Sequence, residues 1–462
     1  RESSGQIKLK LTNANLSYPK YIYQAYQINQ FNSELNWQLE SQNKVNLTWQ
    51  NTNLQTPEVS LTSSGSYQQA ESNLNATINL NYLQLNKLYK LLPTSVSKAT
   101  LKDLQTNLKT GSLNNLQIKI NGKPQNFPFK NESGSFSLNG ELRNTNYNFM
   151  PKWLGLTNLN GNLAIKNQNL TLKLNSGNLD QLSLNNTLIN INDISQNHLT
   201  MTANIQINGS HEDYLDYFRQ SPYEPQITTL EDQLTKLTGS AQTNIKLSLP
   251  LDKPQRLKLS GTYNLENSQL AFKSPALELS EIQGKLNFTQ NGIETSRISA
   301  KTLSSICEFN LLNQNELEIS SPNFDYESAA ALVEPQLTQV IRGHAPIKVN
   351  YNLKQQEVQF QSNLVGVQIN APEPLAKSES NEISNLAVKL NLAPDSHRTL
   401  NFKYANQLAA QASFDRDFQL TNLYLGLGAN NLTPKINPRE ESSPITIQAY
   451  LEQTHLQEWV TF

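Results

Sequence analysis

The sequence predicts a mainly β protein, an elongated, curled antiparallel β-sheet that forms an open hydrophobic groove, with a few short helices interrupting the strands. Three observations predict it. Apolar and polar residues alternate along most of the chain, which places them on opposite faces of strands. Asn-Gly pairs, which favour tight turns, recur from residue 121 to residue 292. Leucines at helical spacing are concentrated in three segments.

The alternating runs follow one another from end to end. In the hairpin at 158–177, the turn KNQN separates two arms. The apolar residues alternate with polar ones in each arm, so each arm has one apolar and one polar face. These apolar residues are Leu163, Ile165, Leu170, Leu172 and Leu174. The Asn-Gly pairs at 139 and 160 lie inside such runs, where a β-bulge is also compatible with them. The other clear runs are 6–11, 76–82, 116–120, 136–142, 244–251, 256–265, 347–353, 386–392 and 445–451.

Three segments, 84–112, 210–240 and 325–344, predict helices because their apolar residues recur at helical spacing. Each contains a glycine near its end, Gly111, Gly239 or Gly343, which we interpret as the left-handed helix stop. The spacing of these glycines predicts a loose repeat, although a coincidence among glycine-terminated helices is the alternative. We therefore predict a single elongated groove domain over 1–462, with approximate repeat units 1–110, 111–238, 239–342 and 343–462.

Composition narrows the class of protein. The 462 residues carry a formal net charge of −1, which favours neither nucleic acid nor an anionic membrane surface as a partner. The single cysteine, Cys307, rules out an intrachain disulfide and is interpreted as a small buried residue on a strand. No run approaches the roughly 18 apolar residues of a membrane helix. The chain begins at Arg1, and we expect it to be a piece of a longer protein.

Catalytic motifs are not evident. The five histidines are far apart, and no metal-spaced pair, nucleophile elbow or phosphate-binding loop occurs. The acidic residues Glu212, Asp213 and Asp216 follow Ser210, where the first turn of a helix favours negative charge. We therefore expect no enzyme activity, no metal site and no cofactor.

The apolar face of the sheet must be covered, either by other parts of the protein or by a ligand. A sandwich, a solenoid, a membrane barrel and an open groove are the available solutions, and the long uninterrupted meander favours the groove. Such a groove could hold lipid tails, because extracting a two-chain lipid into water exposes on the order of 28 methylenes at about 0.8 kcal/mol each. The candidate lining, for which an ordinary core position is the alternative, is Leu163, Ile165, Leu170, Leu172, Leu174, Ile245, Leu247, Leu249, Leu257, Leu259, Leu286, Phe288, Val349, Tyr351, Val388 and Leu390.

Several motifs resemble a known family. The segment 81–142 contains a Leu-Pro step, a glycine after a helical stretch, and an FPF element flanked by glycines; the hairpin after Trp153 and the segment 364–377 follow in the same order. Together they resemble YhdP-type proteins of the AsmA-like family, which is related to TamB and has a repeating β-groove, in its central and C-terminal periplasmic region. The matching residues are Leu92, Pro93, Gly111, Gly122, Phe127, Pro128, Phe129, Gly134, Phe136, Trp153, Leu364, Gly366, Ile369, Pro372, Pro374, Leu375, Lys377 and Trp459.

The resemblance implies an intermembrane lipid-transport bridge of a Gram-negative envelope. Its expected partners are phospholipids, the inner and outer membranes and envelope proteins at its ends; nucleic acid is not expected. The expected location is the periplasm, with an inner-membrane anchor that lies outside this chain. A structural or adhesive β-rich envelope protein with a closed core is the alternative, and an enzyme acting on envelope glycans is the weakest hypothesis.

Overall fold

The structure is a computed structural model. It describes residues 3–17, 26–40, 44–90, 98–196, 198–273, 276–379, 381–393, 398–415, 419–428, 445–450 and 456–461. The chain divides into two compact units. Unit 1 comprises residues 1–230 and 241–261, and unit 2 comprises residues 231–240 and 262–462.

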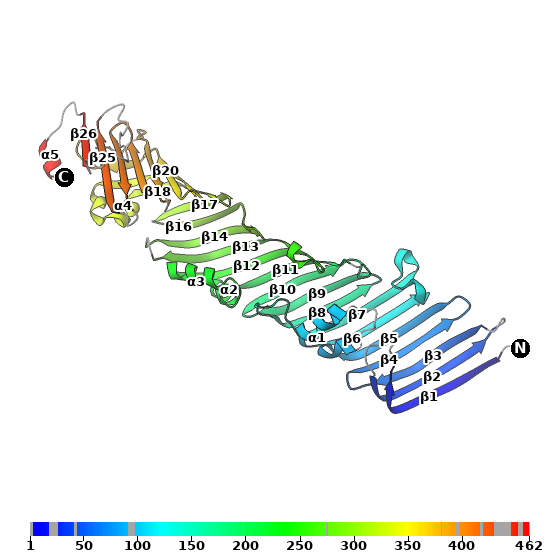
Figure 1. The fold of residues 1–462 in the computed structure, drawn as a ribbon. Coiled ribbons are helices and arrows are strands. Elements are labelled where there is room, and N and C mark those ends of the chain that lie inside the picture. The colour runs from blue at the N-terminus through cyan, green and yellow to red at the C-terminus, as the bar shows by residue number, and fades with distance from the viewer. Residues whose placement is uncertain are drawn as a thin grey trace. The chain divides into compact units, whose positions relative to one another are not determined.

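Unit 1 is built on a layer of long antiparallel strands that pair in sequence order from β1 to β11 (Figure 1). Most connections are short, so each strand lies beside its neighbour in the chain. The strands are β1 (Ser3–Leu16), β2 (Tyr26–Leu39), β3 (Val45–Gln55), β4 (Val59–Gln68), β5 (Asn73–Gln84), β6 (Leu108–Gly122), β7 (Gly134–Tyr147), β8 (Leu156–Lys166), β9 (Asn169–Leu179), β10 (Leu182–Ile191) and β11 (Thr200–Ser210). The next strands, β12 (Leu234–Pro250) and β13 (Lys258–Phe272), contribute residues to both units.

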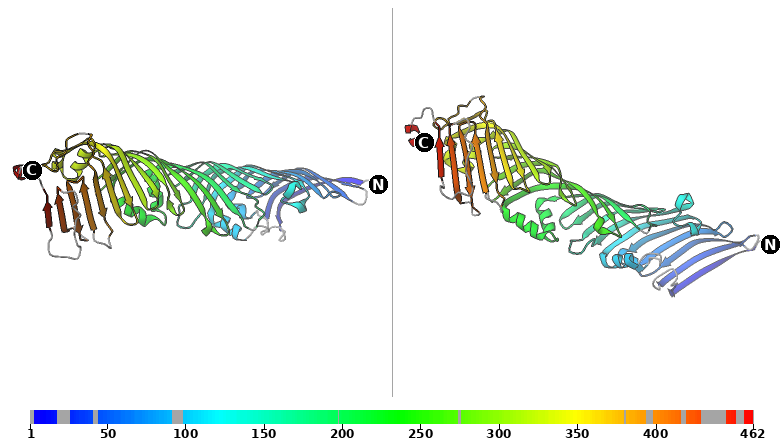
Figure 2. Two further views of the ribbon diagram at one scale, coloured as in Figure 1. Left: turned by 90° about the horizontal axis from the view of Figure 1, so that it is seen from above. Right: turned by 45° about the horizontal axis from the view of Figure 1, so that its top comes forward.

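Unit 2 continues the same design. Its strands form an antiparallel layer in which most strands pair with the next one along the chain (Figure 2). They are β14 (Glu278–Thr289), β15 (Gly292–Ile293), β16 (Ser296–Thr302), β17 (Ser305–Asn313), β18 (Glu316–Asp325), β19 (Ile341–Asn352), β20 (Glu357–Ser362), β21 (Val367–Ile369), β22 (Leu386–Asn391), β23 (Arg398–Tyr404), β24 (Leu408–Phe414), β25 (Leu420–Leu427) and β26 (Ile445–Ala449). The exceptions to this order are β14, which pairs with both β15 and β16, β21, which pairs with β19, and β22, which pairs with β20. The last pair, β25 and β26, is parallel.

Helices occupy the three segments that the leucine spacing indicated. The first segment holds a 3-10 helix, η2 (Leu85–Lys90), and α1 (Lys98–Asn107); the second holds α2 (His211–Arg219) and α3 (Glu224–Gln233); the third holds α4 (Tyr326–Val333) and the 3-10 helix η6 (Pro335–Gln339). Shorter 3-10 turns are η3 (Pro124–Asn126), η4 (Lys130–Glu132) and η5 (Pro254–Arg256), and α5 (Leu456–Thr461) lies near the C-terminus. The prediction of a curled antiparallel sheet interrupted by a few short helices is confirmed.

The acidic first turn of α2 caps the helix, as the sequence indicated. Ser210 Oγ accepts a hydrogen bond from the Asp213 backbone N–H, and the Asp213 carboxylate accepts one from the Ser210 backbone N–H. This capping box satisfies two backbone donors that the first turn leaves free. Cys307 is buried in β17, as predicted, and its burial raises the pKa of its thiol.

The interpretation of Gly111, Gly239 and Gly343 as helix stops is wrong. The helix before Gly111 ends at Asn107, and the glycine lies inside β6; Gly239 and Gly343 lie inside β12 and β19. All three have a positive φ, but a Cβ atom on each would clash with the backbone of a distant residue: Thr145 of β7, Ser268 of β13, and Gly366 just before β21. The repeat units drawn from these glycines remain a prediction.

Asparagines in the left-handed conformation mark β-bulges. The registers of neighbouring strands shift at Asn51, Asn115, Asn144, Asn158 and Asn186, all of which have φ between +46° and +52°. Asparagine tolerates this conformation, and each bulge bends and twists its strand. This accounts for part of the high asparagine content and for the curl of the sheet. Asn160 lies at a register shift, as the bulge interpretation proposed. For the pair at 139 the extra residue lies in β6, at Asn115, and Gly140 is the single residue opposite it.

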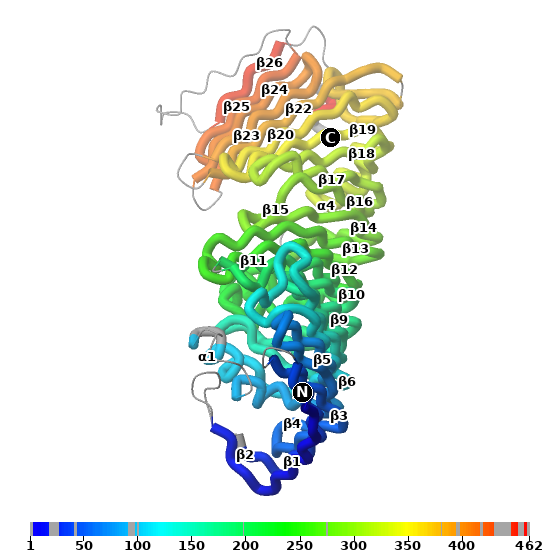
Figure 3. Tube along the Cα trace, turned by 90° about the vertical axis from the view of Figure 1, so that its right-hand side faces the viewer, coloured from blue at the N-terminus to red at the C-terminus, as the bar shows by residue number. Residues whose placement is uncertain are grey.

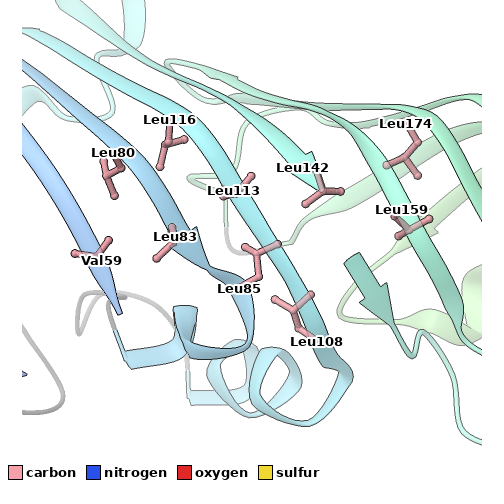
Figure 4. Close-up of a cluster of buried hydrophobic side chains, with 10 residues drawn as sticks. All are labelled: Val59, Leu80, Leu83, Leu85, Leu108, Leu113, Leu116, Leu142, Leu159 and Leu174. Atoms are coloured by element: carbon pink, nitrogen blue, oxygen red, sulfur yellow. The ribbon is translucent and has the colours of Figure 1, made fainter. Parts of the chain in front are cut away.

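The core of unit 1 lies between the sheet and η2–α1. Leu85 of η2 belongs to a buried cluster with Val59, Leu108 and leucines from β5, β6 and β7 (Figure 4). Leu104 of α1 packs against this cluster. Figure 3 shows α1 beside the strand layer and not within it. Two polar contacts hold this helical segment: Lys90 Nζ donates to Glu58 at 3.0 Å, and Tyr147 Oη donates to Asp103 at 3.1 Å. Burial, and then the Asp103 carboxylate, raise the pKa of Tyr147 to about 12.

Candidate functional site

One face of the sheet in unit 1 carries aligned aliphatic side chains. Directly paired residues of neighbouring strands share a face, so the register identifies the rows. One row crosses β5 to β10 without interruption through Ile78, Ile118, Leu138, Ile165, Leu170 and Ile191. The adjacent row contains Leu163, Leu172 and Ile189.

The opposite face is polar. Lys173 lies opposite Asn162, and Asn162 lies opposite Glu141. Gln117 Nε2 donates to Asn79 Oδ1 at 3.0 Å across β5 and β6. The alternation seen in the sequence therefore separates two faces of different chemistry, as it does in a sheet with one solvated face.

The apolar face of unit 1 is not evenly covered. We call the strand ends that join η2–α1 and α2 the helical edge, and the opposite ends the loop edge. Toward the helical edge the side chains are buried, as at Leu83, Leu113, Leu142, Leu159 and Leu182. Toward the loop edge they are half-buried. The open band of unit 1 is this half-buried set: Ile78, Ile118, Leu138, Leu163, Ile165, Leu170, Leu172, Ile189 and Ile191.

Unit 2 has the same gradient. The strand ends near α4 bury Cys307, Phe324, Ala345, Ile347 and Tyr404, which form the core of this unit. The other ends of the same strands leave their apolar face half-buried. The open band of unit 2 is Leu286, Phe288, Ile298, Phe309, Leu311, Leu317, Ile319, Val349, Tyr351, Val358, Phe360, Val388, Leu390, Leu400 and Phe402. One row of directly paired residues crosses β16 to β23 within it, from Ile298 to Phe402.

Salt bridges lie on the polar face of unit 2. Lys348 and Glu318 are 2.7 Å apart, and Lys389 and Glu357 are 2.9 Å apart. The hydrogen bond from Gln359, and then the one from Lys389, lower the pKa of the Glu357 carboxyl. Such exposed pairs keep the outside charged and soluble but add little stability.

The predicted lining residues fall largely in these bands. Leu163, Ile165, Leu170 and Leu172 belong to the open band of unit 1, and Leu174, on the same face, is only 1% exposed. Ile245, Leu247 and Leu249 alternate along β12 and are half-buried, as are Leu257, just before β13, and Leu259, at its beginning. The open band of unit 2 contains the six other residues, Leu286, Phe288, Val349, Tyr351, Val388 and Leu390. That these side chains line a lipid groove remains a prediction.

Sequence reasoning missed several aromatic residues on the apolar face. Phe309, Phe360 and Phe402 lie in one row of unit 2, and the alternation in EVQFQS (357–362) was a signal that could have identified Phe360. In unit 1, Trp49 lies on the apolar face opposite Gly65, whose missing side chain leaves room for the indole ring. Its Nε1–H donates to Ser63 Oγ at 3.0 Å.

An aromatic cluster closes the helical edge of unit 1 near α2. The ring of Trp153, in the β7–β8 connection, lies 5.8 to 6.2 Å from the rings of Tyr217, Phe218 and Tyr223. Tyr217 is buried, and this burial raises the pKa of its hydroxyl. Trp153, which is part of the family pattern, therefore packs the β7–β8 connection against α2.

The segment 364–377 forms a loop in unit 2 that is held by buried side chains and hydrogen bonds. Leu364 and Val367 are buried, and Ile369 and Lys377 pair through two backbone hydrogen bonds. The buried Lys377 ammonium donates to the Val367 carbonyl at 3.0 Å and to the Ser378 carbonyl at 3.3 Å. Trp459 Nε1–H donates to the Glu373 carbonyl at 3.2 Å. Leu92 and Pro93 of the resembling pattern lie outside the described residues.

Within the described residues, no group of three or more His, Cys, Asp or Glu side chains could hold a metal ion. None of the described helices is long and apolar enough to cross a bilayer.

Comparison with known proteins gives two matches. The profile of the family described as YhdP protein matches residues 1–462. The chain is also 26% identical over 216 residues to the intermembrane phospholipid transporter YhdP of Escherichia coli (strain K12). This alignment covers 46% of the chain but only 17% of that relative's length. No solved structure matches the chain significantly.

Proposed function

The chain belongs to the YhdP family, and on that basis we propose that it forms part of an intermembrane bridge that conducts phospholipid acyl chains along a hydrophobic groove. The family match covers the whole chain, and the name of the E. coli relative states its transport activity. The open bands of the two units would be the conducting surface. The setting we propose is the periplasm of a Gram-negative envelope, between inner and outer membranes, with an inner-membrane anchor elsewhere in the protein.

The observation that supports this function most directly is the half-buried state of the open bands. A closed core would cover the aliphatic rows throughout, as Leu142 and Leu174 are covered. Half-buried Leu, Ile and Phe side chains in register offer a continuous apolar strip within each unit. Each methylene placed on such a strip is stabilised by up to about 0.8 kcal/mol relative to water. Tails can therefore lie on the strip while headgroups remain in solvent.

The mechanism needs no catalytic group. Because neighbouring positions along a row of aliphatic side chains present the same chemistry, a tail that moves from one strand to the next exchanges equivalent contacts. The free energy then changes little along the strip, which is the condition for passive conduction. A structural or adhesive protein with a closed core is the competing function, and it predicts no bound lipid.

The test is a matched pair of adjacent substitutions. Val388 lies in the open band of unit 2, and Ala387 lies on the polar face, opposite Gln361 and Lys403. Val388→Glu should remove most of the co-purified phospholipid detected by native mass spectrometry and stop lipid transfer between donor and acceptor vesicles, because it places a carboxylate on the path of the tails. Ala387→Glu should change neither. Equal lipid content in the two variants, or no lipid in the purified parent protein, would contradict the proposal.

A further inference from the structure

The loop 123–133, between β6 and β7, presents an aromatic ring to solvent in a fixed position. Phe127 is 55% exposed, although its ring lies 5.8 Å from that of Phe129 and 5.3 Å from that of Phe136. Its backbone N–H donates to the Pro124 carbonyl at 3.1 Å. The exposed phenyl ring is therefore held by its neighbours.

Phe129 anchors this loop. It is 1% exposed, and its ring occupies the space that a Cβ atom on Gly122 or Gly134 would need, with Phe129 atoms 2.8 and 2.5 Å from those positions. Any other residue at these two positions would displace the ring. The glycines and Phe129 together fix the loop over the ends of β6 and β7.

Phe127 extends the apolar face beyond the strands. Phe136 is directly paired with Ile120 on that face, at the loop edge of unit 1. The contact between Phe127 and Phe136 therefore carries the apolar surface from the open band onto the loop. An exposed apolar group that is held in place at the rim of an apolar strip is typical of a binding contact.

Charged side chains occur in this loop and at the same edge of the sheet. Lys123 and Lys130 belong to the loop and are exposed, and Lys166 ends β8 at the same edge. The acidic neighbours are Glu132 and Asp193; Asp193 lies 3.7 Å from Lys130 and also accepts hydrogen bonds from Ser195 and Gln196. An exposed phenyl ring and exposed ammonium groups on one short loop match the chemistry at the boundary between lipid tails and phosphate headgroups.

We infer that the loop 123–133 is a headgroup-side binding site for a phospholipid whose acyl chain lies on the open band of unit 1. Phe127 contacts the carbonyl end of the acyl chain, and Lys123 and Lys130 bind the phosphate. The terminal methyl group then points toward the helical edge, where the same face is buried by the protein. The inference rests on the proposed function, because it requires an acyl chain on the open band.

The test uses two photoreactive phosphatidylcholines, one with a diazirine next to the acyl carbonyl and one with a diazirine at the chain terminus. After irradiation of the purified protein with each lipid, labelled peptides are identified by mass spectrometry. The carbonyl-end probe should label residues 123–133, and the terminal probe should label β8 and β9 at residues 163–172, in the open band. A reversed pattern, or labelling of both regions by both probes to the same extent, would overturn the orientation.

A matched pair of variants tests the ring itself. Phe127→Glu should lower labelling of the loop by the carbonyl-end probe about fivefold, since the exposed part of a phenyl ring contributes roughly that factor in affinity. Phe149→Glu is the control, because Phe149 is 40% exposed in the β7–β8 connection at the helical edge. The control should leave the labelling unchanged. An equal effect of both substitutions would overturn the role of Phe127.

The outcomes also separate this inference from the proposed function. Labelling of β8 and β9 at residues 163–172 without any labelling of the loop would disprove the loop site and leave the function standing. No labelling of either region by either lipid would disprove both. Excess inorganic phosphate should lower the labelling only in part, because it competes for Lys123 and Lys130 but not for the Phe127 contact. Complete loss of the labelling in phosphate would show that the loop binds only the anion and would overturn the site.

Discussion

Gly111 in β6 lies directly against Thr145 in β7. A Cβ atom on Gly111 would lie 2.8 Å from the Thr145 Cα atom and closer still to its Oγ1, and Gly111 has a φ of +124°. Thr145 is buried next to the bulge at Asn144, and its hydroxyl donates to the Arg143 carbonyl at 3.2 Å. The glycine therefore allows two backbones to approach where one strand bulges. Gly239 faces Ser268, after Asn267, in the same way in unit 2.

Gly111→Ala should be strongly destabilising. The substitution adds a clash with backbone to a conformation that side chains disfavour, so the free energy of unfolding should fall by about 3 kcal/mol or more. Gly292→Ala is the matched control, because Gly292 has a φ of +122° with nothing within 4 Å of the Cβ position. It should lose only about 1 kcal/mol. Urea unfolding measures both. Equal losses would show that the contact with Thr145 costs nothing.

This contact shows why the strands could be predicted and the role of the glycine could not. Alternation with a period of two depends only on residues that are close in the sequence. The apolar residues between Leu163 and Leu174 could therefore be placed on one face correctly. The partner of Gly111 is 34 residues away (145 − 111 = 34), and a local pattern carries no information about the residue across the ladder. A glycine after a helical stretch was therefore interpreted as a helix stop, which is the commoner local reason for it.

The gradient from buried to half-buried side chains along each strand could not be predicted from the sequence either. Leu172 and Leu174 look identical in the sequence, but Leu174 is 1% exposed and Leu172 is half-buried. The difference depends on which strand ends the helical segments cover and on where the bulges bend the sheet. Alternation predicts the face of a residue but not its distance from an edge.

Three consecutive residues of β9 should therefore respond differently to a negative charge. Leu174→Glu buries a carboxylate and should lower the free energy of unfolding by about 4 kcal/mol or more. Leu172→Glu should cost less than about 2 kcal/mol, since its carboxylate can reach water, but should lower the amount of co-purified phospholipid. Lys173→Glu, on the polar face, should change neither quantity. Urea unfolding and native mass spectrometry separate these outcomes, and an unchanged lipid content in Leu172→Glu would contradict the conducting role of the open band of unit 1.

The two phenylalanines of the loop 123–133 should have different roles: Phe129 stabilises the fold, and Phe127 contacts lipid. Phe129→Ala should lower the free energy of unfolding by about 3 kcal/mol, because it empties a buried site against Gly122 and Gly134. Phe127→Ala should cost under about 1 kcal/mol, because more than half of its ring already contacts water. Thermal or urea unfolding measures the difference. Similar losses in the two variants would show that Phe127 serves packing and not binding.

Unit 1 should lose stability in mild acid through His211. This histidine is the first residue of α2 and is buried, and burial lowers the pKa of its imidazole. The unfolded chain, with an ordinary pKa near 6.5, then binds more protons than the folded one, so stability is full above about pH 6.5 and falls as the pH decreases below it. Measuring urea unfolding between about pH 7 and about pH 5.5 keeps ordinary carboxyl groups largely ionised. The slope should flatten in His211→Asn and persist in His198→Asn, because His198 is an exposed histidine of the same unit. An unchanged slope in His211→Asn would assign the acid sensitivity to another group.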